Sequence, residues 1–269
     1  MDFKCIDFVL LIPCYNNIEG LKKSIKSINY FNDKFEIFII DDGSTTPISL
    51  ADVYDINPFV SARLIRLKNN QGIVYALNLA LKILKKKDNV KYIARLDAGD
   101  ICYPQRFYKQ VEYLNAHTEV ALLGSWVSFI PTLTGKKYSY ITKTTHDDII
   151  KEMHYRCSFI HPSVMFRKSV LDSIGLYPFN FIHAEDYAYF WMILKKFKGA
   201  ILPQMLIEVY FSNENISSRN YRLQLLNRKK VVKIFGDNFI RKQVGLISLN
   251  LKLMMPKKWI NQLKYYFKK

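Results

Sequence analysis

The chain has 269 residues, 49% of them hydrophobic, and a formal net charge of +17. This apolar fraction excludes a mostly disordered chain, and the length suits one large α/β domain or one domain with an appendage. The charge is uneven, because residues 219–269 contain 14 Lys or Arg and one acid and so carry +13 of the total. The first 218 residues are only mildly basic, at +4.

The cysteines and the N-terminus indicate a cellular compartment. The four cysteines lack C-x-x-C spacing, which fits a reducing compartment better than a disulfide framework; they are Cys5, Cys14, Cys102 and Cys157. The first apolar run ends at Pro13 and is flanked by Asp2 and Asp7, so it lacks a signal peptide's basic start. No window approaches the ~18 uncharged apolar residues of a membrane span. We expect a cytoplasmic protein.

Apolar runs and spacings predict the elements of the first half. In chain order we expect a strand at 6–12, a helix at 18–30, strands at 35–40 and 62–67, a helix at 72–84, a strand at 91–96 and a helix at 104–117. The simplest fold for this order is a mostly parallel sheet with helices on both faces.

The second half is less regular. We expect strands at 120–130, 163–167 and 204–211, an exposed loop or hairpin at 131–147, and helices at 168–174 and 185–197. Beyond Ser217 the pattern is helical and basic. We therefore expect an α/β domain over 1–218 and a basic, amphipathic helical segment over 219–269.

Three acidic clusters are candidates for chemistry: Asp41-Asp42, the pair Asp97 and Asp100, and Glu185-Asp186. The first two follow strands, and ligands sit at the carboxyl ends of strands in open α/β sheets. Carboxylates there suit Mg or Mn, although a solvated turn that caps the next helix explains them equally well. The third cluster begins a helix, where the dipole favours acids or where a general base could stand.

Several classes of protein are disfavoured because the chain lacks their sequence signatures. The chain has no P-loop, no G-x-G-x-x-G after a strand and no G-x-S-x-G elbow. A nucleic-acid-binding protein would spread basic groups over a groove, whereas the first 218 residues here carry all three acidic clusters. A nucleotidyltransferase normally has a glycine-rich, basic loop after the first strand, and residues 12–20 contain no Lys or Arg. Both remain alternatives.

Seven stretches, in order and with compatible spacing, resemble the family 2 glycosyltransferases of the GT-A fold. They are LLIPCYNN (10–17), IIDDGST (39–45), NNQGIVYALNLAL (69–81), RLDAGDICYPQRFYKQVEYL (95–114), LLGSW (122–126), HPSVMFRKSVLDSIGLY (161–177) and AEDYAYFWMIL (184–194). The resemblance covers residues 6–218. It implies an inverting transferase that uses a UDP-hexose or UDP-N-acetylhexosamine and a saccharide or lipid-linked saccharide acceptor. Bacterial surface-polysaccharide or lipooligosaccharide synthesis is the implied setting.

The resemblance also implies residue roles. Matching the family's nucleotide site are Pro13, Tyr15, Asn16, Asp41, Asp42 and Asn78; matching positions along the donor and acceptor cleft are His161 and Arg167. Asp186 matches the catalytic base, with Glu185 as the second candidate. Asp97 and Asp100 fall in the motif that holds Mn²⁺ or Mg²⁺. Gly99 stands where many relatives carry a ligand aspartate.

The C-terminal segment interleaves Lys or Arg with bulky apolar side chains, as in ISLNLKLMM (247–255). Helices of this kind lie in a membrane interface and are attracted to anionic lipid. The alternative is a solvated basic surface on helices packed against the domain. We expect a peripheral protein on the inner face of the cytoplasmic membrane that binds no nucleic acid.

Overall fold

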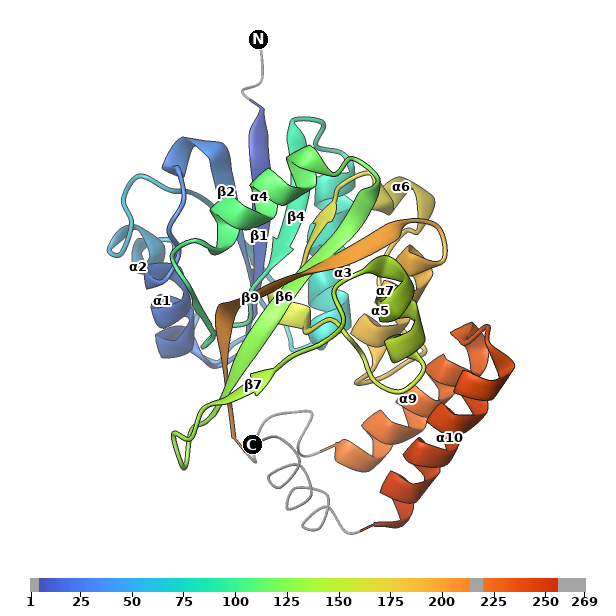
Figure 1. Cartoon of the computed structure of the whole chain (residues 1–269). Helices are drawn as coiled ribbons and strands as arrows, with labels where there is room; N and C mark the ends of the chain where they lie inside the picture. The colour runs from blue at the N-terminus through green and yellow to red at the C-terminus, as the bar shows by residue number, and fades with distance from the viewer. Residues whose placement is uncertain (1–4, 213–219, 256–269) are drawn as a thin grey trace.

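A computed structural model describes residues 5–212 and 220–255. One mixed sheet runs through this part of the chain, with helices on both faces (Figure 1). Its strands are β1 (Ile6–Cys14), β2 (Phe35–Asp41), β3 (Ser61–Arg66), β4 (Val90–Arg95), β5 (Ile101–Cys102), β6 (Val120–Pro131), β7 (Tyr138–Tyr140), β8 (Met165–Arg167) and β9 (Lys198–Phe211).

The helices are α1 (Ile18–Lys26), α2 (Ala51–Tyr54), α3 (Ile73–Lys85), α4 (Arg106–Ala116), α5 (His146–Met153), α6 (Val170–Ser173), α7 (Glu185–Leu194), α9 (Tyr221–Phe235) and α10 (Phe239–Met254). Short 3₁₀ turns lie at Asn32–Lys34 and His161–Ser163. The expected helices and strands of the first half are confirmed, with the short α2 and β5 added. The α5 helix replaces part of the loop expected at 131–147.

The first four strands form the parallel half of the sheet, in the order β3-β2-β1-β4. They are runs of apolar residues because both of their faces are covered. Alternate side chains of β1 enter two different cores: Val9 and Leu11 pack on the face that carries α3, and Phe8 and Leu10 pack on the opposite face. This parallel half confirms the expected α/β fold.

The other half of the sheet mixes directions. Strand β8 is antiparallel to both β4 and β6, while β6 and β9 run parallel along most of their length. Strand β9 starts at Lys198, earlier than expected, and its register skips Pro203 and Gln204 against β6. A bulge of this kind lets a proline lie inside a strand.

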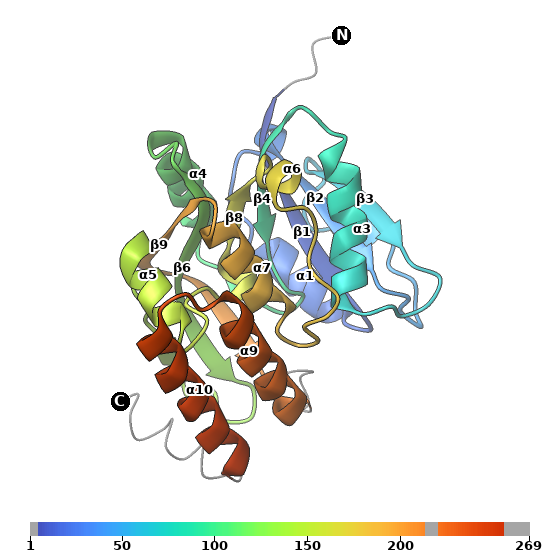
Figure 2. The same cartoon turned by 90° about the vertical axis from the view of Figure 1, so that its right-hand side faces the viewer.

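Helices α9 and α10 form a hairpin at the lower end of the molecule, the end toward which β1 runs (Figures 1 and 2). Leu225, Val231 and Val232 of α9 join the body's core. The expected helical character beyond Ser217 is confirmed over α9 and α10. The expected boundary at 218/219 and the residues after 255 lie outside the described ranges.

Candidate active site

The parallel strands bring the expected site residues to one edge of the sheet. Cys14 at the end of β1 is level with Asp41 at the end of β2, and Leu11 is level with Arg95 at the end of β4. The turns that follow these strands therefore emerge side by side. The first two acidic clusters share one sheet edge, as expected.

The turn after β1 and the turn after β2 are tied together. The backbone N–H of Asn16 donates to the hydroxyl of Ser44 (2.9 Å), and the side-chain oxygen of Asn16 accepts from the N–H of Thr45 (2.8 Å). Pro13 follows the buried run of β1, Cys14 after it is buried again, and Tyr15 beyond the strand is 49% exposed. An exposed aromatic ring beside fixed backbone groups is suited to stacking on a planar ligand.

The two acids of the first cluster, Asp41 and Asp42, have different surroundings. Asp41 is fully buried; it accepts hydrogen bonds from the N–H groups of Ser44 and Ile48 and lies 3.5 Å from Arg66. Its part in nucleotide binding stays a prediction, because these contacts already explain its burial.

Asp42 accepts from the N–H groups of Gln71 (2.8 Å) and Gly72 (2.9 Å), one at each carboxylate oxygen. Burial raises its pKa, against those two hydrogen bonds. Asp42 therefore fixes the start of α3, and each of its oxygens keeps a second lone pair for a ligand.

Asn78 and His161, both expected to contact ligands, hold the protein together. The Asn78 side chain accepts from the N–H of Tyr177 and donates to the carbonyl of Tyr177, both at 2.9 Å. His161 is buried and lies 2.9 Å from the Tyr177 hydroxyl. Any contact of these two residues with the nucleotide stays a prediction.

The place predicted for Arg167, along the donor and acceptor cleft, is wrong. Arg167 is level with Tyr92 in the first part of β4, away from the acidic turn. Its guanidinium donates to three carbonyls at and beyond the end of α4, those of Leu114, His117 and Val120. Arg167 therefore caps α4 and does not line the cleft.

Helix α1 holds the acidic turn at 97–100. The Ser24 hydroxyl donates to the carbonyl of Asp100 (2.8 Å) and accepts from the N–H of Gly99 (2.9 Å). The Asn17 amide donates to the carbonyl of Ala98 (2.8 Å). Backbone and side-chain bonds from one helix thus fix the turn before any ligand binds.

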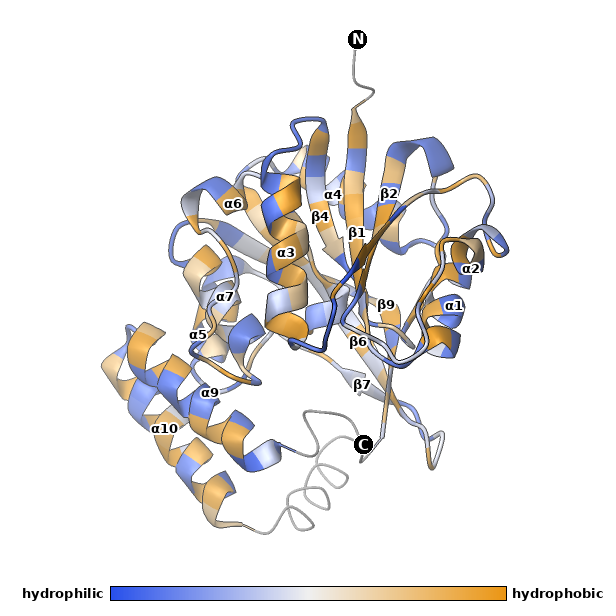
Figure 3. Cartoon of the chain, turned by 180° about the vertical axis from the view of Figure 1, so that it is seen from behind, coloured by the Kyte–Doolittle hydropathy of each residue, from blue (hydrophilic) through white to orange (hydrophobic). Residues whose placement is uncertain are grey.

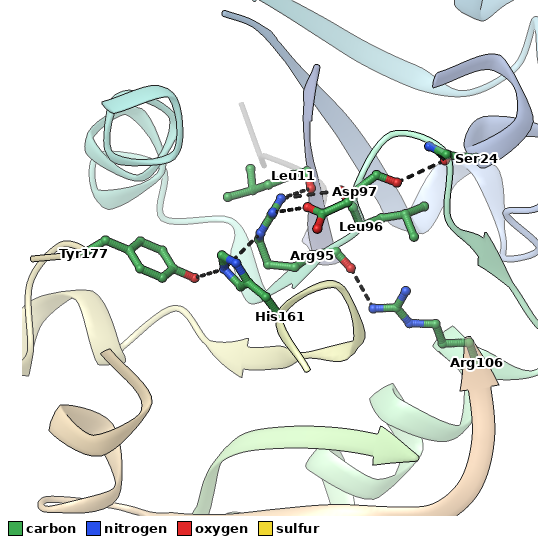
Figure 4. Close-up of polar contacts among 9 residues, drawn as sticks. Leu11, Ser24, Arg95, Leu96, Asp97, Arg106, His161 and Tyr177 are labelled. Atoms are coloured by element: carbon green, nitrogen blue, oxygen red, sulfur yellow. Dashed lines mark hydrogen bonds and ion pairs between the residues drawn. The ribbon is translucent and has the colours of Figure 1, made fainter. Parts of the chain in front are cut away.

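The partly exposed carboxylate of Asp97 is held by a buried arginine. The Nη2 of Arg95 donates to Asp97 Oδ1 at 2.6 Å (Figure 4). Arg95 is fully buried, and its Nη1 donates to the carbonyl of Leu11 (2.8 Å). Arg95 was not predicted from the sequence, because an arginine at the end of an apolar run usually marks the point where a strand reaches solvent.

Asp100 is buried, and its carboxylate is half satisfied. Its Oδ1 accepts from the N–H of Tyr210 (3.1 Å), while Oδ2 has no partner among the described residues. Burial, followed by the charge of Asp97, raises its pKa well above the usual range. A cation held by this turn would favour the ionised form of Asp100 against both effects.

The residues available as metal ligands decide whether a divalent cation fits the acidic turn. The described residues contain no group of three His, Cys, Asp or Glu that could hold a metal. Asp97 and Asp100 supply two carboxylates, and Mg²⁺ or Mn²⁺ at nucleotide sites commonly takes one or two carboxylates together with phosphate oxygens and water. The turn therefore fits a cation that the ligand's phosphates help to hold.

The third acidic cluster begins α7. Glu185 is buried with Oε2 unpartnered among the described residues, and burial followed by the charge of Asp186 raises its pKa to about 7. Asp186 accepts from the N–H of Tyr187 (2.7 Å), and burial raises its pKa too. The charge of Asp97 contributes to both shifts. Three carboxylates thus share one electrostatic environment, and a carboxyl with a pKa near 7 is suited to moving protons.

Arg228 of α9 was also missed. Its guanidinium lies 5.5 Å from the centre of the Tyr187 ring, and its charge partly offsets the rise that burial causes in the pKa of Asp186. Nothing in the basic C-terminal segment distinguishes this arginine from its neighbours.

A hollow lined by Glu119, His146 and Lys198 lies at the starts of β6 and β9, away from the acidic turn.

Relatives of known class resemble most of the chain. The amylovoran biosynthesis glycosyltransferase AmsE of Erwinia amylovora is 29% identical over 93% of this chain and 95% of its own length. The UDP-Gal:alpha-D-GlcNAc-diphosphoundecaprenol beta-1,3-galactosyltransferase of Escherichia coli is 25% identical over 80% of this chain and 77% of its own length.

Solved structures share the fold at low identity. S. aureus TarS 1-349 in complex with UDP-GlcNAc aligns with a TM-score of 0.67 at 16% identity, over 94% of this chain and 74% of that one. The mannosyltransferase PcManGT from Pyrobaculum calidifontis, in complex with GDP-Man and Mn2+, aligns with a TM-score of 0.64 at 15% identity, over 96% of this chain and 72% of that one.

A family model described as glycosyl transferase family 2 matches residues 9–175, which is more than half of the chain. The match spans the turns after β1, β2 and β4 and ends shortly before the acid pair of α7. It favours a transferase over the nucleotidyltransferase and nucleic-acid-binding alternatives. The protein is a glycosyltransferase: its chain belongs to glycosyl transferase family 2.

Proposed function

We propose that this glycosyltransferase moves a hexose or N-acetylhexosamine from its UDP derivative to a hydroxyl of a saccharide acceptor, with inversion at the anomeric carbon. The observation that carries the proposal is a pair of buried carboxylate oxygens without a partner among the described residues, Oδ2 of Asp100 and Oε2 of Glu185. The charge of Asp97 influences the pKa of both Glu185 and Asp186, and the turn that holds Asp97 follows β4 at the sheet edge where β2 also ends. The family assignment and the UDP-GlcNAc complex of TarS support a nucleotide-sugar donor.

The nucleoside would bind at the turns after β1 and β2. Tyr15 offers an exposed ring, and Pro13 and Asn16 shape the turn that carries it. Asp42 offers a carboxylate oxygen to an N–H of the base or a hydroxyl of the ribose. The diphosphate would then extend toward Asp97.

Asp186 would act as the general base. It accepts the proton of the acceptor hydroxyl while the hydroxyl oxygen forms a bond to the anomeric carbon from the face opposite the diphosphate. The bond between the anomeric carbon and the diphosphate oxygen breaks, and its electron pair leaves with UDP. General base catalysis of this kind contributes roughly 10²–10⁴-fold. Arg228 supports the assignment, because it favours the ionised form of Asp186.

Asp97 and Asp100 would hold Mn²⁺ or Mg²⁺ together with the diphosphate. When bound, such an ion neutralises the charge that grows on the leaving group. The Mn2+ complex of PcManGT and the unpartnered oxygen of Asp100 support this. Arg95 holds the Asp97 carboxylate in place.

A panel of sugar nucleotides, each with and without Mn²⁺, tests the donor. We expect release of UDP from a UDP-sugar and an inverted anomer in the product. Release of pyrophosphate, or a retained anomer, would contradict the proposal.

The acceptor is proposed to be a lipid-linked saccharide in surface-polysaccharide or lipooligosaccharide synthesis. The Escherichia relative acts on a diphosphoundecaprenol-linked acceptor, and the Erwinia relative belongs to amylovoran biosynthesis; both support this class. A synthetic saccharide carried on a diphosphate with an alkyl chain should accept sugar at lower concentration than the free saccharide. Equal use of both would count against a lipid-linked acceptor.

Helix α10 is proposed to dock on an anionic membrane surface. Five apolar side chains at spacings of four and three residues are 49–81% exposed; this α10 stripe consists of Ile240, Val244, Ile247, Leu251 and Met254. Figure 3 shows hydrophobic and hydrophilic positions alternating along α10. Residues 220–255 also contain eight Lys or Arg against Asp237 alone. Apolar side chains combined with positive charge fit an interface rich in anionic lipid. No helix in the described residues is long and apolar enough to cross a membrane.

Vesicle binding tests this docking. We expect the protein to sediment with phosphatidylglycerol vesicles and not with phosphatidylcholine vesicles, and to be released by salt. Dimers held together by the α10 stripe, with no vesicle binding, would mean that a second copy covers the stripe.

A further inference from the structure

A buried chain of side chains leads from Tyr177 to Asp97. The Tyr177 hydroxyl lies 2.9 Å from Nε2 of His161, and Nε of Arg95 lies 3.3 Å from the same nitrogen. Arg95 then reaches Asp97 through Nη2 (2.6 Å). Figure 4 shows the four side chains in a row, from the Tyr177 ring to the acidic turn. Tyr177, His161 and Arg95 are all buried.

The donors and acceptors in this chain follow from their chemistry. A guanidinium can only donate, so Nε2 of His161 must carry the lone pair that Arg95 uses. The Tyr177 hydroxyl must then also donate to this nitrogen, so that the two donors share its single lone pair. The imidazole is neutral with its proton on Nδ1, in agreement with burial, which lowers the pKa of His161 well below its usual range. The Tyr177 hydroxyl and the guanidinium together fix the imidazole.

Tyr177 is itself held rigidly. The Asn78 side chain binds both the N–H and the carbonyl of Tyr177. The ring of Tyr189 packs against the Tyr177 ring with centroids 4.1 Å apart. The hydroxyl of Tyr177 therefore reaches His161 from a fixed point on the segment that leads to Glu185.

Asp97 depends on the other end of this chain. Among the described residues, the only side chain that bonds to its carboxylate is Arg95. The other guanidinium contacts of Arg95 are the carbonyls of Leu11 and Leu96 and the ring of His161. A shift of the imidazole would therefore move the guanidinium and, with it, the Asp97 carboxylate.

We propose that Tyr177 is a positioning residue, which acts through His161 and Arg95 to aim the Asp97 carboxylate at the cation and diphosphate of the donor. The inference rests on the proposed function. It gives the segment between α6 and α7, which precedes the acid pair, a direct connection to the donor side of the site. Groups that orient a metal ligand typically change metal affinity by ~10–100-fold when removed.

The test compares Tyr177→Phe with Tyr189→Phe. Tyr189 is a matched control, because its hydroxyl is also buried and donates to one acceptor, the carbonyl of Gly175 (2.9 Å). Calorimetry would measure UDP binding with saturating Mn²⁺ and with EDTA. We expect Tyr177→Phe to weaken Mn²⁺-dependent UDP binding by about 10-fold and to leave metal-free binding unchanged. Tyr189→Phe should change neither, and both should lower the melting temperature alike.

Equal UDP affinities in the two variants, with and without Mn²⁺, would overturn the inference. A second pair of variants decides if Tyr177→Phe does not fold. His161→Gln keeps an acceptor and should retain Mn²⁺-dependent binding, whereas His161→Leu should lose it; equal behaviour of this pair also overturns the inference. A wild-type protein that binds no UDP at all would instead contradict the proposed function.

Discussion

The α/β body and the α9–α10 hairpin use the same apolar residue types in opposite ways. In the body, Ile and Leu side chains of the central strands, such as Leu10 and Ile39, are fully buried. On α10, Ile240 is 73% exposed and Met254 81%. The central strands of the body are covered on both faces, while α10 leaves a continuous apolar stripe uncovered. We propose that the body carries the chemistry, with Arg228 of α9 beside it, and that α10 determines where the protein binds; the predictions below test this division.

The largest expected effect is on chemistry. Replacing Asp186 with Asn removes the proposed base and keeps the shape, so we expect kcat/KM for transfer to fall by roughly 10²–10⁴-fold. Vesicle binding should not change. Transfer within about threefold of wild type would shift the role of base to Glu185, and the Glu185→Gln variant would then show the loss.

The next largest effect is expected on vesicle binding by the α9–α10 hairpin. Replacing Ile247 and Leu251 with Glu puts two charges on the α10 stripe, which we expect to weaken binding to phosphatidylglycerol vesicles by about 10–100-fold. Hydrolysis of the donor in solution should stay at the wild-type rate. The control is Ser248→Glu together with Asn250→Glu, which adds the same charge beside the stripe. Equal losses in both pairs would mean that net charge, and not the stripe, binds lipid.

Glu185 and Asp237 should change the stability of the protein with pH in opposite directions. Burial raises the pKa of Glu185 from 4.5 to about 7, so its contribution to the free energy of unfolding falls as pH rises from 4.5 to 7. We expect Glu185→Gln to stabilise the protein by ~1–3 kcal/mol at pH 8 and by little at pH 4.5. Urea unfolding at the two pH values measures this.

Asp237, in the turn between α9 and α10, is the counterpart in the hairpin. Burial opposes its ionisation, but Lys195 at 3.0 Å, a backbone hydrogen bond and His154 together outweigh burial, and the pKa is lowered. Asp237→Asn should therefore destabilise the protein above the carboxyl's usual pKa, and the effect should be lost as pH falls from that value through the lowered pKa. A stabilising effect of Asp237→Asn at pH 8 would contradict this contrast.

The smallest effect tests how the acidic turn is held. Ser24→Ala removes the hydroxyl that joins α1 to the carbonyl of Asp100 and the N–H of Gly99. We expect a loss of ~1–3 kcal/mol in unfolding free energy, since buried backbone groups lose their partner. Calorimetry should also find a several-fold weaker Mn²⁺-dependent binding of UDP. Ser27→Ala, which frees the N–H of Cys102 beyond the turn, is the control.

The parallel half of the fold was predictable because apolar runs such as FEIFII (35–40) are what a strand covered on both faces requires. The acidic turns were predictable because they come directly after those strands. Strand β9 was predicted too short because Pro203 reads as a break, and only the bulge opposite β6 accommodates it. Helix α5 was missed because it buries only Ile149 and Met153.

The candidate site was predictable by residue type and not by role. Acids were found because carboxylates at strand ends are conspicuous. Arg95 and Arg228 were missed, since their importance lies in contacts across the sheet and from a distant helix. Arg167 was misplaced for the same reason, because its capping of α4 depends on strand register.

Gly99 has a consequence for how this protein could change over time. Its φ is +112°, a region that L side chains rarely adopt, while a Cβ there would meet only Asn17 Nδ2 at 3.6 Å. Space for a Cβ therefore exists, but the backbone opposes any L side chain by a cost on the order of 1–3 kcal/mol. An aspartate at position 99, as in the D-A-D-D form, would need the backbone of the turn to change along with the side chain. A single substitution at Gly99 therefore cannot add a third carboxylate to the turn without that cost.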